Sequence, residues 1–230
     1  EIRDRDEAVS IMVDKANIAA DTIKNNYDCC VAYYDEHLLE ISIEQRRLLG
    51  EFEPALQNDE FVMYLQPQVK RDGAAKGAEA LVRWVHPSRG ILTPYAFIDI
   101  LENAGLIYKL DLYIWEKAAQ KLAEWKEKGY GSYHISVNIS TKDFYIIDIY
   151  ETFTGLINKY GIAASNLHLE ITETTLMTDF EKNMNIIHKL QGVGFRVEID
   201  DFGSGYSSLN MLKDISADVL KSINGLPSQI

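Results

Sequence analysis

The sequence predicts an α/β barrel with a parallel sheet, and three observations lead to this fold class. From residue 60 onward, strand patterns alternate with helical patterns, which is typical of parallel strands connected by helices. Three of the predicted strands have one apolar face and one strongly polar face. No glycine-rich turn follows the first strand, although a doubly wound dinucleotide-binding sheet requires one. A closed barrel is therefore favoured over an open, doubly wound sheet.

A short unit precedes this alternation. Apolar residues recur at helical spacing and predict a helix over residues 6–26, and the run CCVAYY predicts a strand over residues 29–34. A charged segment of helical period predicts a connecting helix over residues 36–57.

The barrel elements follow in order. Strands are expected over residues 60–69, 77–84, 134–140, 167–173, 195–200 and 217–223, and helices over residues 93–105, 111–128, 149–161, 178–192 and 207–215. Thr93, Pro94 and Gly105 suit the start and end of the first helix. Thr178 and Glu181 form the pattern of a capping box for the fourth.

The polar face of the third, fourth and fifth strands carries most of the chemistry. Residues two apart on a strand share a face, which groups His134, Ser136, Asn138, His168, Glu170, Thr172, Arg196, Glu198 and Asp200. An antiparallel sheet with one side in water gives the same alternation, but helical segments separate these strands. The polar residues are therefore expected inside the barrel, where His134 and His168 line the wall rather than bind a metal.

Asn138, Glu170 and Asp200 lie at or near the carboxyl ends of their strands, where barrel enzymes place their active sites. Glu79 joins them from the second strand. Burying these oxygen groups together is costly without a cation, and oxygen ligands without cysteine favour magnesium, manganese or calcium. A divalent-metal site is predicted, with unrelated polar strand ends as the open alternative.

Composition limits the partners. The net charge is −12 and the pI is about 4.9, which argues against long nucleic acid but leaves a small phosphate ligand possible if a metal neutralises it. No apolar run approaches the roughly 18–20 residues that cross a bilayer, so no membrane contact is expected from this segment. Adjacent Cys29 and Cys30 are interpreted as reduced thiols of a cytoplasmic protein. Because the chain starts at Glu1 rather than at a methionine, it is expected to begin inside a longer protein.

Five motifs then carry a family resemblance. GAEALVRW, SVNIS, LEITET, IDDFGSGYSSL and ADVLK occur in the order and approximate spacing of the EAL-domain family, the bacterial cyclic di-GMP phosphodiesterases. The resemblance implies a variant (β/α)8 barrel that hydrolyses cyclic di-GMP to linear pGpG in second-messenger signalling. Residues 1–37 resemble the end of a GGDEF (diguanylate cyclase) domain, which makes 38–50 a linker helix and 51–230 the EAL domain. The cyclase signature itself is absent, so no synthase activity is expected.

The resemblance also implies roles for single residues. The ligands of a two-metal site, holding Mg²⁺ or Mn²⁺, are expected to be Glu79, Asn138, Glu170, Asp200 and Asp201. Lys221 resembles the lysine that orients the attacking water, and Glu79 and Asp201 share the catalytic role. The substrate-binding residues are expected to be Gln66, Leu81 and Arg83. Glu173 resembles the glutamate that fixes the DFGSG loop, which in the family couples the site to dimerisation, so a homodimer is expected.

Two departures from the family pattern support a second hypothesis. Ile223 stands where the family has an acidic residue two positions after the lysine. Only six strands are expected where closure needs eight, and a further metal-ligand glutamate and a substrate glutamine would follow Ile230, so the barrel is expected to be incomplete. The alternative function is therefore a degenerate EAL domain that binds cyclic di-GMP as a receptor or passes signals through its dimer. An unrelated barrel metallohydrolase is a third, weaker hypothesis.

Overall fold

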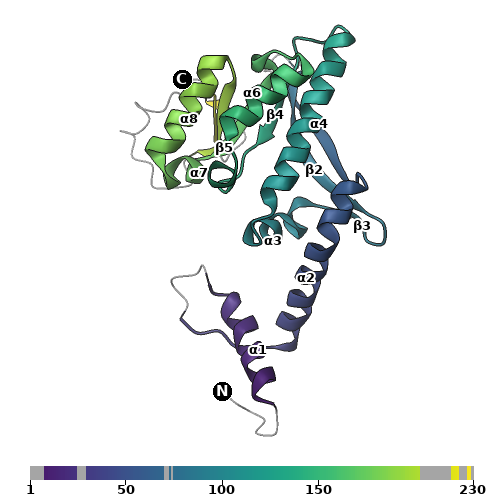
Figure 1. The fold of residues 1–230 in the computed structure, drawn as a ribbon, viewed down its shortest axis with the longest axis vertical. Helices are drawn as coiled ribbons and strands as arrows, with labels where there is room; N and C mark the ends of the chain where they lie inside the picture. The colour runs from purple at the N-terminus through teal and green to yellow at the C-terminus, as the bar shows by residue number, and fades with distance from the viewer. Residues whose placement is uncertain are drawn as a thin grey trace. The chain divides into compact units, whose positions relative to one another are not determined.

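The computed structural model describes residues 8–24, 30–69, 73, 75–202, 219–222 and 227–228. The chain divides into two compact units, residues 1–54 and residues 55–230, and each is described by itself. Figure 1 shows the chain as a ribbon coloured from the N-terminus to the C-terminus.

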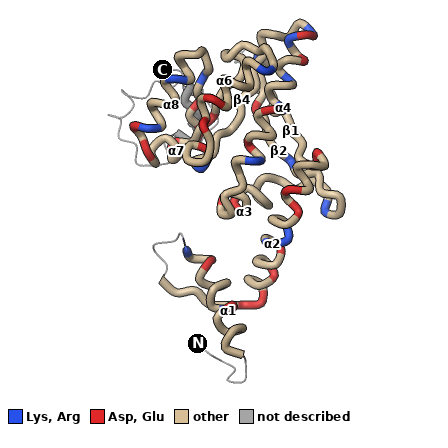
Figure 2. The backbone as a smooth tube through the Cα atoms, in the orientation of Figure 1, with Lys and Arg blue, Asp and Glu red and all other residues tan. Residues whose placement is uncertain are grey.

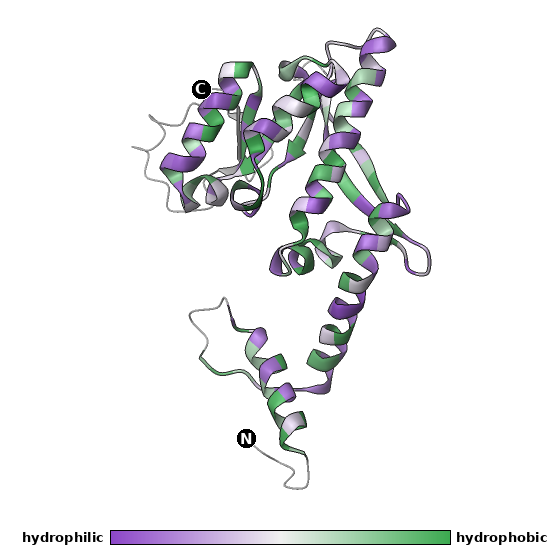
Figure 3. Cartoon of the chain, viewed as in Figure 1, coloured by the Kyte–Doolittle hydropathy of each residue, from purple (hydrophilic) through white to green (hydrophobic). Residues whose placement is uncertain are grey.

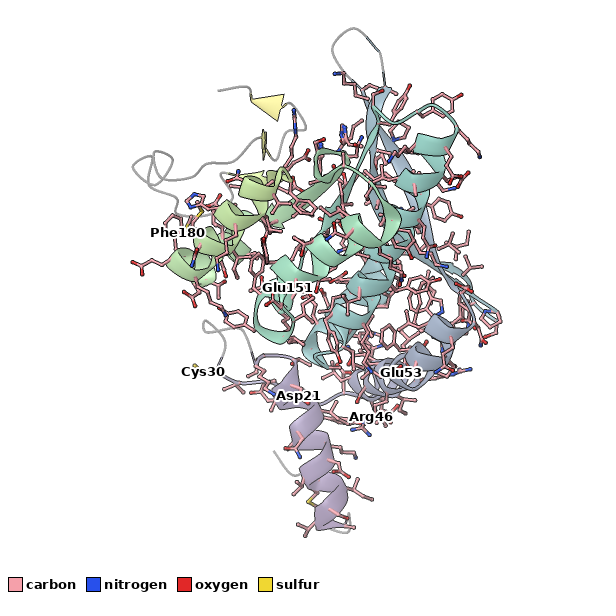
Figure 4. The ribbon with its side chains drawn as sticks, turned by 45° about the horizontal axis from the view of Figure 1, so that its top comes forward. Asp21, Cys30, Arg46, Glu53, Glu151 and Phe180 are labelled. Carbon is pink, nitrogen blue, oxygen red and sulfur yellow. The ribbon has the colours of Figure 1, made fainter. Side chains whose placement is uncertain are left out.

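The first unit is helical. Its described residues form helix α1 (Val9–Asp21), a turn at residues 22–24, and α2 (Glu36–Gln57), whose last residues belong to the second unit. The predicted strand is wrong for residues 30–34, which have no regular structure; Cys29 lies outside the described residues. A strand needs a partner, and the described part of this unit contains no other strand. Cys30 is exposed, as Figure 4 shows.

The second unit is built on one mixed sheet. Its strands are β1 (Phe61–Val69), β2 (Ala75–His86), β3 (Gly90–Leu92), β4 (His134–Asn138), β5 (Leu167–Thr172), β6 (Arg196–Phe202), β7 (Val219–Ser222) and β8 (Pro227–Ser228). The order is β1-β2-β4-β5-β6-β7-β8, with β3 paired to β2. The ladders from β2 through β4, β5 and β6 to β7 are parallel. This part of the prediction is confirmed.

The first strand departs from the prediction, because β1 pairs with β2 in the antiparallel sense. Only residues 70–74 separate the two strands. A parallel connection needs about a dozen residues or more, so this linker permits only a hairpin. The short strands β3 and β8 were also missed, and both pair antiparallel with their neighbours.

Helices lie between the parallel strands. They are the 3₁₀ turn η1 (Pro94–Ala96), α3 (Ile98–Asn103), α4 (Ile107–Glu127), α5 (Asp143–Ile146), α6 (Ile149–Tyr160), the turn η2 (Ala164–Asn166), α7 (Glu173–Thr178) and α8 (Phe180–Val193). Helices α4, α6 and α8 lie side by side in Figure 1, with α4 packed on β4 and α8 on β6. Each carries both hydrophobic and hydrophilic residues in Figure 3, as expected of helices that cover a core. The described chain contains no helix that is long and apolar enough to span a bilayer.

The apolar face of the strands packs against these helices. The seven apolar residues of β4, β5 and β6 on that face are buried: Ile135, Val137, Leu167, Leu169, Ile171, Val197 and Ile199. The rings of Trp115 on α4 and Phe153 on α6 lie 4.5 Å apart. Both are fully buried, and fully burying such a side chain contributes roughly 1.5–3 kcal/mol.

Several helix boundaries differ from the prediction. The helix expected over residues 93–105 is split, because Phe97 has φ −141° between η1 and α3, and Thr93 makes no side-chain cap. The predicted capping box is wrong: Thr178 is the last residue of α7, and its hydroxyl donates to the carbonyl of Thr174 at 2.9 Å. Helix α8 continues past Gly192 and ends at Val193. Its C-cap residue is Gly194, which has φ +108°.

The remaining elements are present near their predicted positions, with bounds that differ by up to several residues, or lie outside the described residues. Helix α4 starts four residues before its predicted start at Asp111, and α6 coincides with the prediction to within one residue. The predicted sixth strand is present as β7. The helix predicted over residues 207–215 lies outside the described residues.

Candidate functional site

The sheet register brings four of the five predicted metal ligands onto one face. Asn138 lies opposite Glu170, and Thr172 lies opposite Asp200. Ser136 lies opposite Glu79. Because residues two apart share a face, Glu79, Asn138, Glu170 and Asp200 lie on the same side of four neighbouring strands, β2, β4, β5 and β6.

This polar face is largely buried. Ser136 and Glu170 have no exposed surface, and His168 and Glu198 are buried as well. The expectation that the polar residues face an interior rather than water is met at these positions. Asn138 is exposed, and Glu79 and Asp200 are partly exposed. The solvent exposure of the four predicted ligands therefore ranges from the buried Glu170 to the exposed Asn138.

A hydrogen-bonded layer lies on the same face, nearer the amino ends of β4, β5 and β6, and includes one residue of β1. We call Gln68, His134, Ser136, His168 and Glu198 the polar floor. His134 Nε2 lies 2.8 Å from Gln68 Oε1, and His168 Nδ1 lies 2.6 Å from Glu198 Oε1. The Ser136 hydroxyl donates to Glu198 Oε2 at 3.4 Å.

Three members of the floor are close enough to raise the question of a metal. The ligand atoms of His134, His168 and Glu198 all lie within 4.8 Å of one another. The two imidazole rings are stacked, however, 3.8 Å apart and 3° from parallel. Ring-nitrogen lone pairs lie in the ring plane, so stacked rings direct them along parallel planes, whereas a tetrahedral site needs them to converge. The geometry favours a hydrogen-bonded wall, as the sequence predicted for the two histidines.

The set of predicted ligands on this face fits a hard divalent cation. It consists of carboxylate and amide oxygens from Glu79, Asn138, Glu170 and Asp200, which Mg²⁺ and Mn²⁺ prefer. A buried carboxylate such as Glu170 gains from a nearby positive charge. These residues are therefore suited to hold the predicted metal.

The two neighbouring aspartates lie at an irregularity in the sheet. Between β6 and β7, Ile199 pairs with Leu220 and Phe202 pairs with Ser222. Two residues of β6, Asp200 and Asp201, thus stand opposite one residue of β7, Lys221. A β-bulge produces this register, bends the strand and re-aims its side chains, often beside active sites. The backbone therefore brings all three predicted residues to one point; the side chains of Asp201 and Lys221 lie outside the described set.

The predicted substrate residues lie on β1 and β2. Gln66 pairs with Glu79 and is exposed. Leu81 and Arg83 share the face of Glu79 and are partly exposed. The Arg83 guanidinium lies 5.8 Å from the centre of the Tyr64 ring, and its Nη1 donates to the Val82 carbonyl at 2.8 Å. Sequence reasoning missed Tyr64, although its parity on β1 is that of Gln66.

Glu173 is buried in the first turn of α7, directly after β5. Thr172 caps this helix, because its hydroxyl accepts from the Thr175 backbone N–H at 3.2 Å. The predicted partner of Glu173, the DFGSG loop of residues 201–205, lies outside the described residues from Gly203 on.

Sequence reasoning also missed a group of buried and half-buried acids beside β4. Asp143 opens α5 five residues after Asn138, is fully buried, and accepts from the Ser140 backbone N–H at 2.8 Å. Burial raises the pKa of Asp111 on α4 well above its usual value, and Asp143 raises it further. Burial also raises the pKa values of Asp143 and Glu102. No pattern along the chain announces this group, because it forms where α3, α4 and α5 meet.

Trp115 anchors the end of β4. Its indole N–H donates to the backbone carbonyl of Asn138 at 2.9 Å. The backbone of this predicted ligand is therefore held from behind by a fully buried side chain of α4.

The chain is similar to known proteins over most of its length. Residues 50–224 match the family model described as the EAL domain. The bifunctional diguanylate cyclase/cyclic di-GMP phosphodiesterase MucR of Pseudomonas aeruginosa is 32% identical over 213 residues, which cover 92% of this chain and 30% of that protein. The cyclic di-GMP phosphodiesterase PdeR of Escherichia coli is 32% identical over 73% of this chain and 25% of its own length. The chain thus spans less than a third of these relatives.

Solved structures are similar as well. The PaMucR phosphodiesterase in complex with c-di-GMP has a TM-score of 0.73 and 34% identity, covering 76% of this chain and 72% of that one. The Xanthomonas citri FimX EAL domain in complex with c-di-GMP has a TM-score of 0.72 at 22% identity, over 80% of this chain and 72% of that one. The second similarity concerns the fold alone.

Proposed function

Because this chain belongs to the EAL domain family, we propose that it hydrolyses cyclic di-GMP to linear pGpG with Mg²⁺ or Mn²⁺. The observation that carries the proposal is the shared face of Glu79, Asn138, Glu170 and Asp200 on four neighbouring strands. Relatives named as cyclic di-GMP phosphodiesterases and a similar structure with c-di-GMP bound support the choice of substrate.

In this proposal the residues divide into holders of metal and holders of substrate. Glu79, Asn138, Glu170 and Asp200 hold the first metal, and Asp200 and Asp201 share the second. The metal pair, when bound, activates a water molecule and neutralises charge on the scissile phosphate. Such neutralisation lets a chain of net charge −12 accept an anionic nucleotide.

The remaining residues orient the reactants. Lys221 donates a hydrogen bond that holds the attacking water, opposite Asp200 and Asp201 in the β6–β7 register. Arg83 offers charge-assisted donors to a phosphate oxygen, and its partly exposed position leaves it accessible. Gln66 and Leu81 contact the nucleotide, and Glu173 fixes the loop after β6.

The wider setting is part of the same proposal. The strands belong to a (β/α)8 barrel of EAL type that is incomplete at its C-terminal end, and residues 1–37 are the end of a GGDEF-like domain followed by the linker helix 38–50. The match to MucR covers 92% of the chain and so extends before residue 50, which supports a shared tandem arrangement. We propose that the protein acts as a homodimer in the bacterial cytoplasm.

A second candidate function rests on one residue. Ile223 occupies the position of the family's acidic residue after the lysine, and a missing carboxylate weakens a two-metal site. In this version the chain binds cyclic di-GMP without cleaving it and acts as a receptor or a dimerising module.

Product analysis distinguishes the candidates. The chain is incubated with cyclic di-GMP and Mg²⁺ or Mn²⁺, and nucleotides are separated by chromatography. We expect pGpG, inhibition by Ca²⁺, and at least a 100-fold loss of rate in Glu170→Gln, because an oriented metal ligand contributes several kcal/mol. The exposed Glu127→Gln on α4 is the matched control and retains the activity. Tight binding without pGpG supports the receptor, and absence of binding overturns both candidates.

A further inference from the structure

Gln68, a member of the polar floor, contacts the proposed metal ligand Glu170. Gln68 lies two residues after Gln66 on β1, opposite Gly77. Because β1 is antiparallel to β2, Gln68 lies deeper in the sheet than Gln66, on the side of the strands' amino ends. Its amide makes contacts with residues of two other strands, β4 and β5.

The acceptor end of this amide is held by His134. His134 Nε2 lies 2.8 Å from Gln68 Oε1, and its ring stacks on His168. The ring occupies the space above Gly77, where an added Cβ would meet His134 Nε2 at 2.4 Å. The His134 ring is therefore packed between Gly77 and His168. Its movement is restricted, and so is the position of the nitrogen that contacts Gln68 Oε1.

The donor end of the amide faces the carboxylate of Glu170. Gln68 Nε2 lies 3.4 Å from Glu170 Oε1 and 3.3 Å from the Ser136 hydroxyl. The opposite amide orientation would place Oε1 against the Glu170 carboxylate, two acceptors without a proton between them. The carboxylate therefore fixes the amide with its N–H₂ toward Glu170, which leaves the His134 nitrogen as the donor to Oε1.

We propose that Gln68 is a positioning residue that sets the orientation of Glu170 for metal binding. The inference rests on the proposed function, because it takes Glu170 as a metal ligand. The chain of contacts runs from Gly77 through His134 and Gln68 to Glu170. Groups that orient a metal ligand from behind typically contribute 10–100-fold to metal affinity or activity.

The test measures metal binding directly. Mn²⁺ is titrated into the full chain and into Gln68→Leu, with affinity read by calorimetry and the bound ion by electron paramagnetic resonance. We expect the dissociation constant of Gln68→Leu to rise about 10-fold and kcat to fall with little change in KM, because Gln68 orients a ligand rather than the nucleotide. Gln120→Leu is the matched control, since Gln120 is exposed on α4 and donates to the Tyr160 hydroxyl at 3.0 Å; its Mn²⁺ affinity should equal that of the unmodified chain.

Glu170→Gln separates failure of this inference from failure of the proposed function. If Glu170→Gln weakens Mn²⁺ binding but Gln68→Leu does not, the inference is overturned and the proposed site stands. If the unmodified chain does not bind Mn²⁺ at all, or if Glu170→Gln binds it unchanged, the proposed metal site fails and takes the inference with it. Far-ultraviolet circular dichroism and thermal melts of each variant show whether it is folded. A Gln68→Leu that melts earlier yet keeps its Mn²⁺ affinity gives Gln68 a structural role only and overturns the inference.

Discussion

At the scale of single residues, Asp111 and Asp143 form a pair that favours holding a proton. Burial is the largest cause of the raised pKa of each, and the pKa of Glu102 nearby is raised for the same reason. Two carboxyl groups in contact cannot both ionise without repulsion. The folded chain therefore binds a proton here more tightly than the unfolded chain does.

This pair predicts a fall in stability as pH rises. Because the folded pKa is raised, the contribution is fully present below the unfolded value of about 4 and is lost as pH rises through the folded pKa. Asp143→Asn replaces the protonated form by a neutral amide that still accepts from the Ser140 N–H. We expect urea unfolding at pH 4, 6 and 8 to show a smaller loss of stability in the variant, by about 1.4 kcal/mol if the substitution removes a one-unit rise in pKa.

The exposed Asp179→Asn is the control for that measurement and should follow the unmodified chain at each pH. A difference between Asp143→Asn and the unmodified chain that stays constant from pH 4 to pH 8 would show that the pair does not take up a proton on folding.

Individual residues show which parts of the site the sequence predicts and which it does not. The face shared by Glu79, Asn138, Glu170 and Asp200 follows from strand parity, which is a local property. The contact of Asp143 with Asp111 depends on how α4 approaches the loop after β4, which no local pattern encodes. Gln68 is predictable only in part. The sequence places it on the same face of β1 as Gln66, but its contact with Glu170 depends on the antiparallel direction of β1, which the sequence pattern does not reveal.

At the scale of elements, α6 has well-defined ends. Asp148 Oδ1 accepts from the Glu151 backbone N–H at 3.0 Å, and Gly161 ends the helix at φ +59°. Figure 4 labels Glu151 in this first turn and Phe180 at the start of α8. By contrast, the N-cap of α8, Asp179, makes no side-chain cap hydrogen bond.

This contrast gives a prediction with a built-in comparison. Asp148→Ala should lower the free energy of unfolding by about 1 kcal/mol, the usual contribution of a capping side chain. Asp179→Ala should change it by less than about 0.5 kcal/mol, as an exposed substitution without such a bond. Chemical denaturation of both variants measures the difference, and equal losses would contradict the assigned roles of the two caps.

The helix starts show why elements were predicted better than their boundaries. Periodicity identified α4, α6 and α8, because each must bury one apolar side. The pattern Thr178-x-x-Glu181 matched a capping box, but the short helix α7 extends through Thr178. A capping-box motif predicts a helix start only where the chain before it is not already helical. Here α7 includes Thr178, so Thr178 cannot be the N-cap of a new helix.

At the scale of the whole molecule, negative charge dominates. The net charge is −12, and Figure 2 shows acidic positions spread along the described backbone. Ion pairs such as Lys117 with Asp59 at 2.8 Å and Lys159 with Glu116 at 2.5 Å are partly exposed. Exposed pairs contribute about 0–1 kcal/mol each, whereas the excess charge repels itself throughout the folded state.

We therefore expect added salt to stabilise the chain. Raising NaCl from about 10 mM to about 150 mM shortens the screening length from roughly 30 Å to roughly 8 Å. The melting temperature should rise by about 2–4 °C, which corresponds to roughly 1 kcal/mol for a chain of this size. Differential scanning calorimetry measures it, with sucrose at matched osmolarity as the control. A fall in melting temperature would mean that the ion pairs outweigh the general repulsion.

The sequence predicts the fold class correctly but not the direction of every strand. Alternating strands and helices indicated a parallel sheet, and the β2-to-β7 ladders confirm it. The pattern of β1 contains no information on its direction, which depends on the length of the connection at residues 70–74. The run at residues 29–34 has the composition of a strand, but a strand forms only beside a partner, and composition does not supply one.

Trp115 gives the molecule an optical property that bears on its site. The chain has three tryptophans: the indole of Trp84 donates to Glu60 Oε2, Trp125 lies against Tyr133, and Trp115 alone among them donates to the backbone of Asn138. Indole fluorescence responds to changes in hydrogen bonding at its nitrogen. If Asn138 holds a metal as we propose, we expect the bound cation to change the emission of Trp115 more than that of Trp84 and Trp125. The intrinsic fluorescence of the chain would then report metal binding.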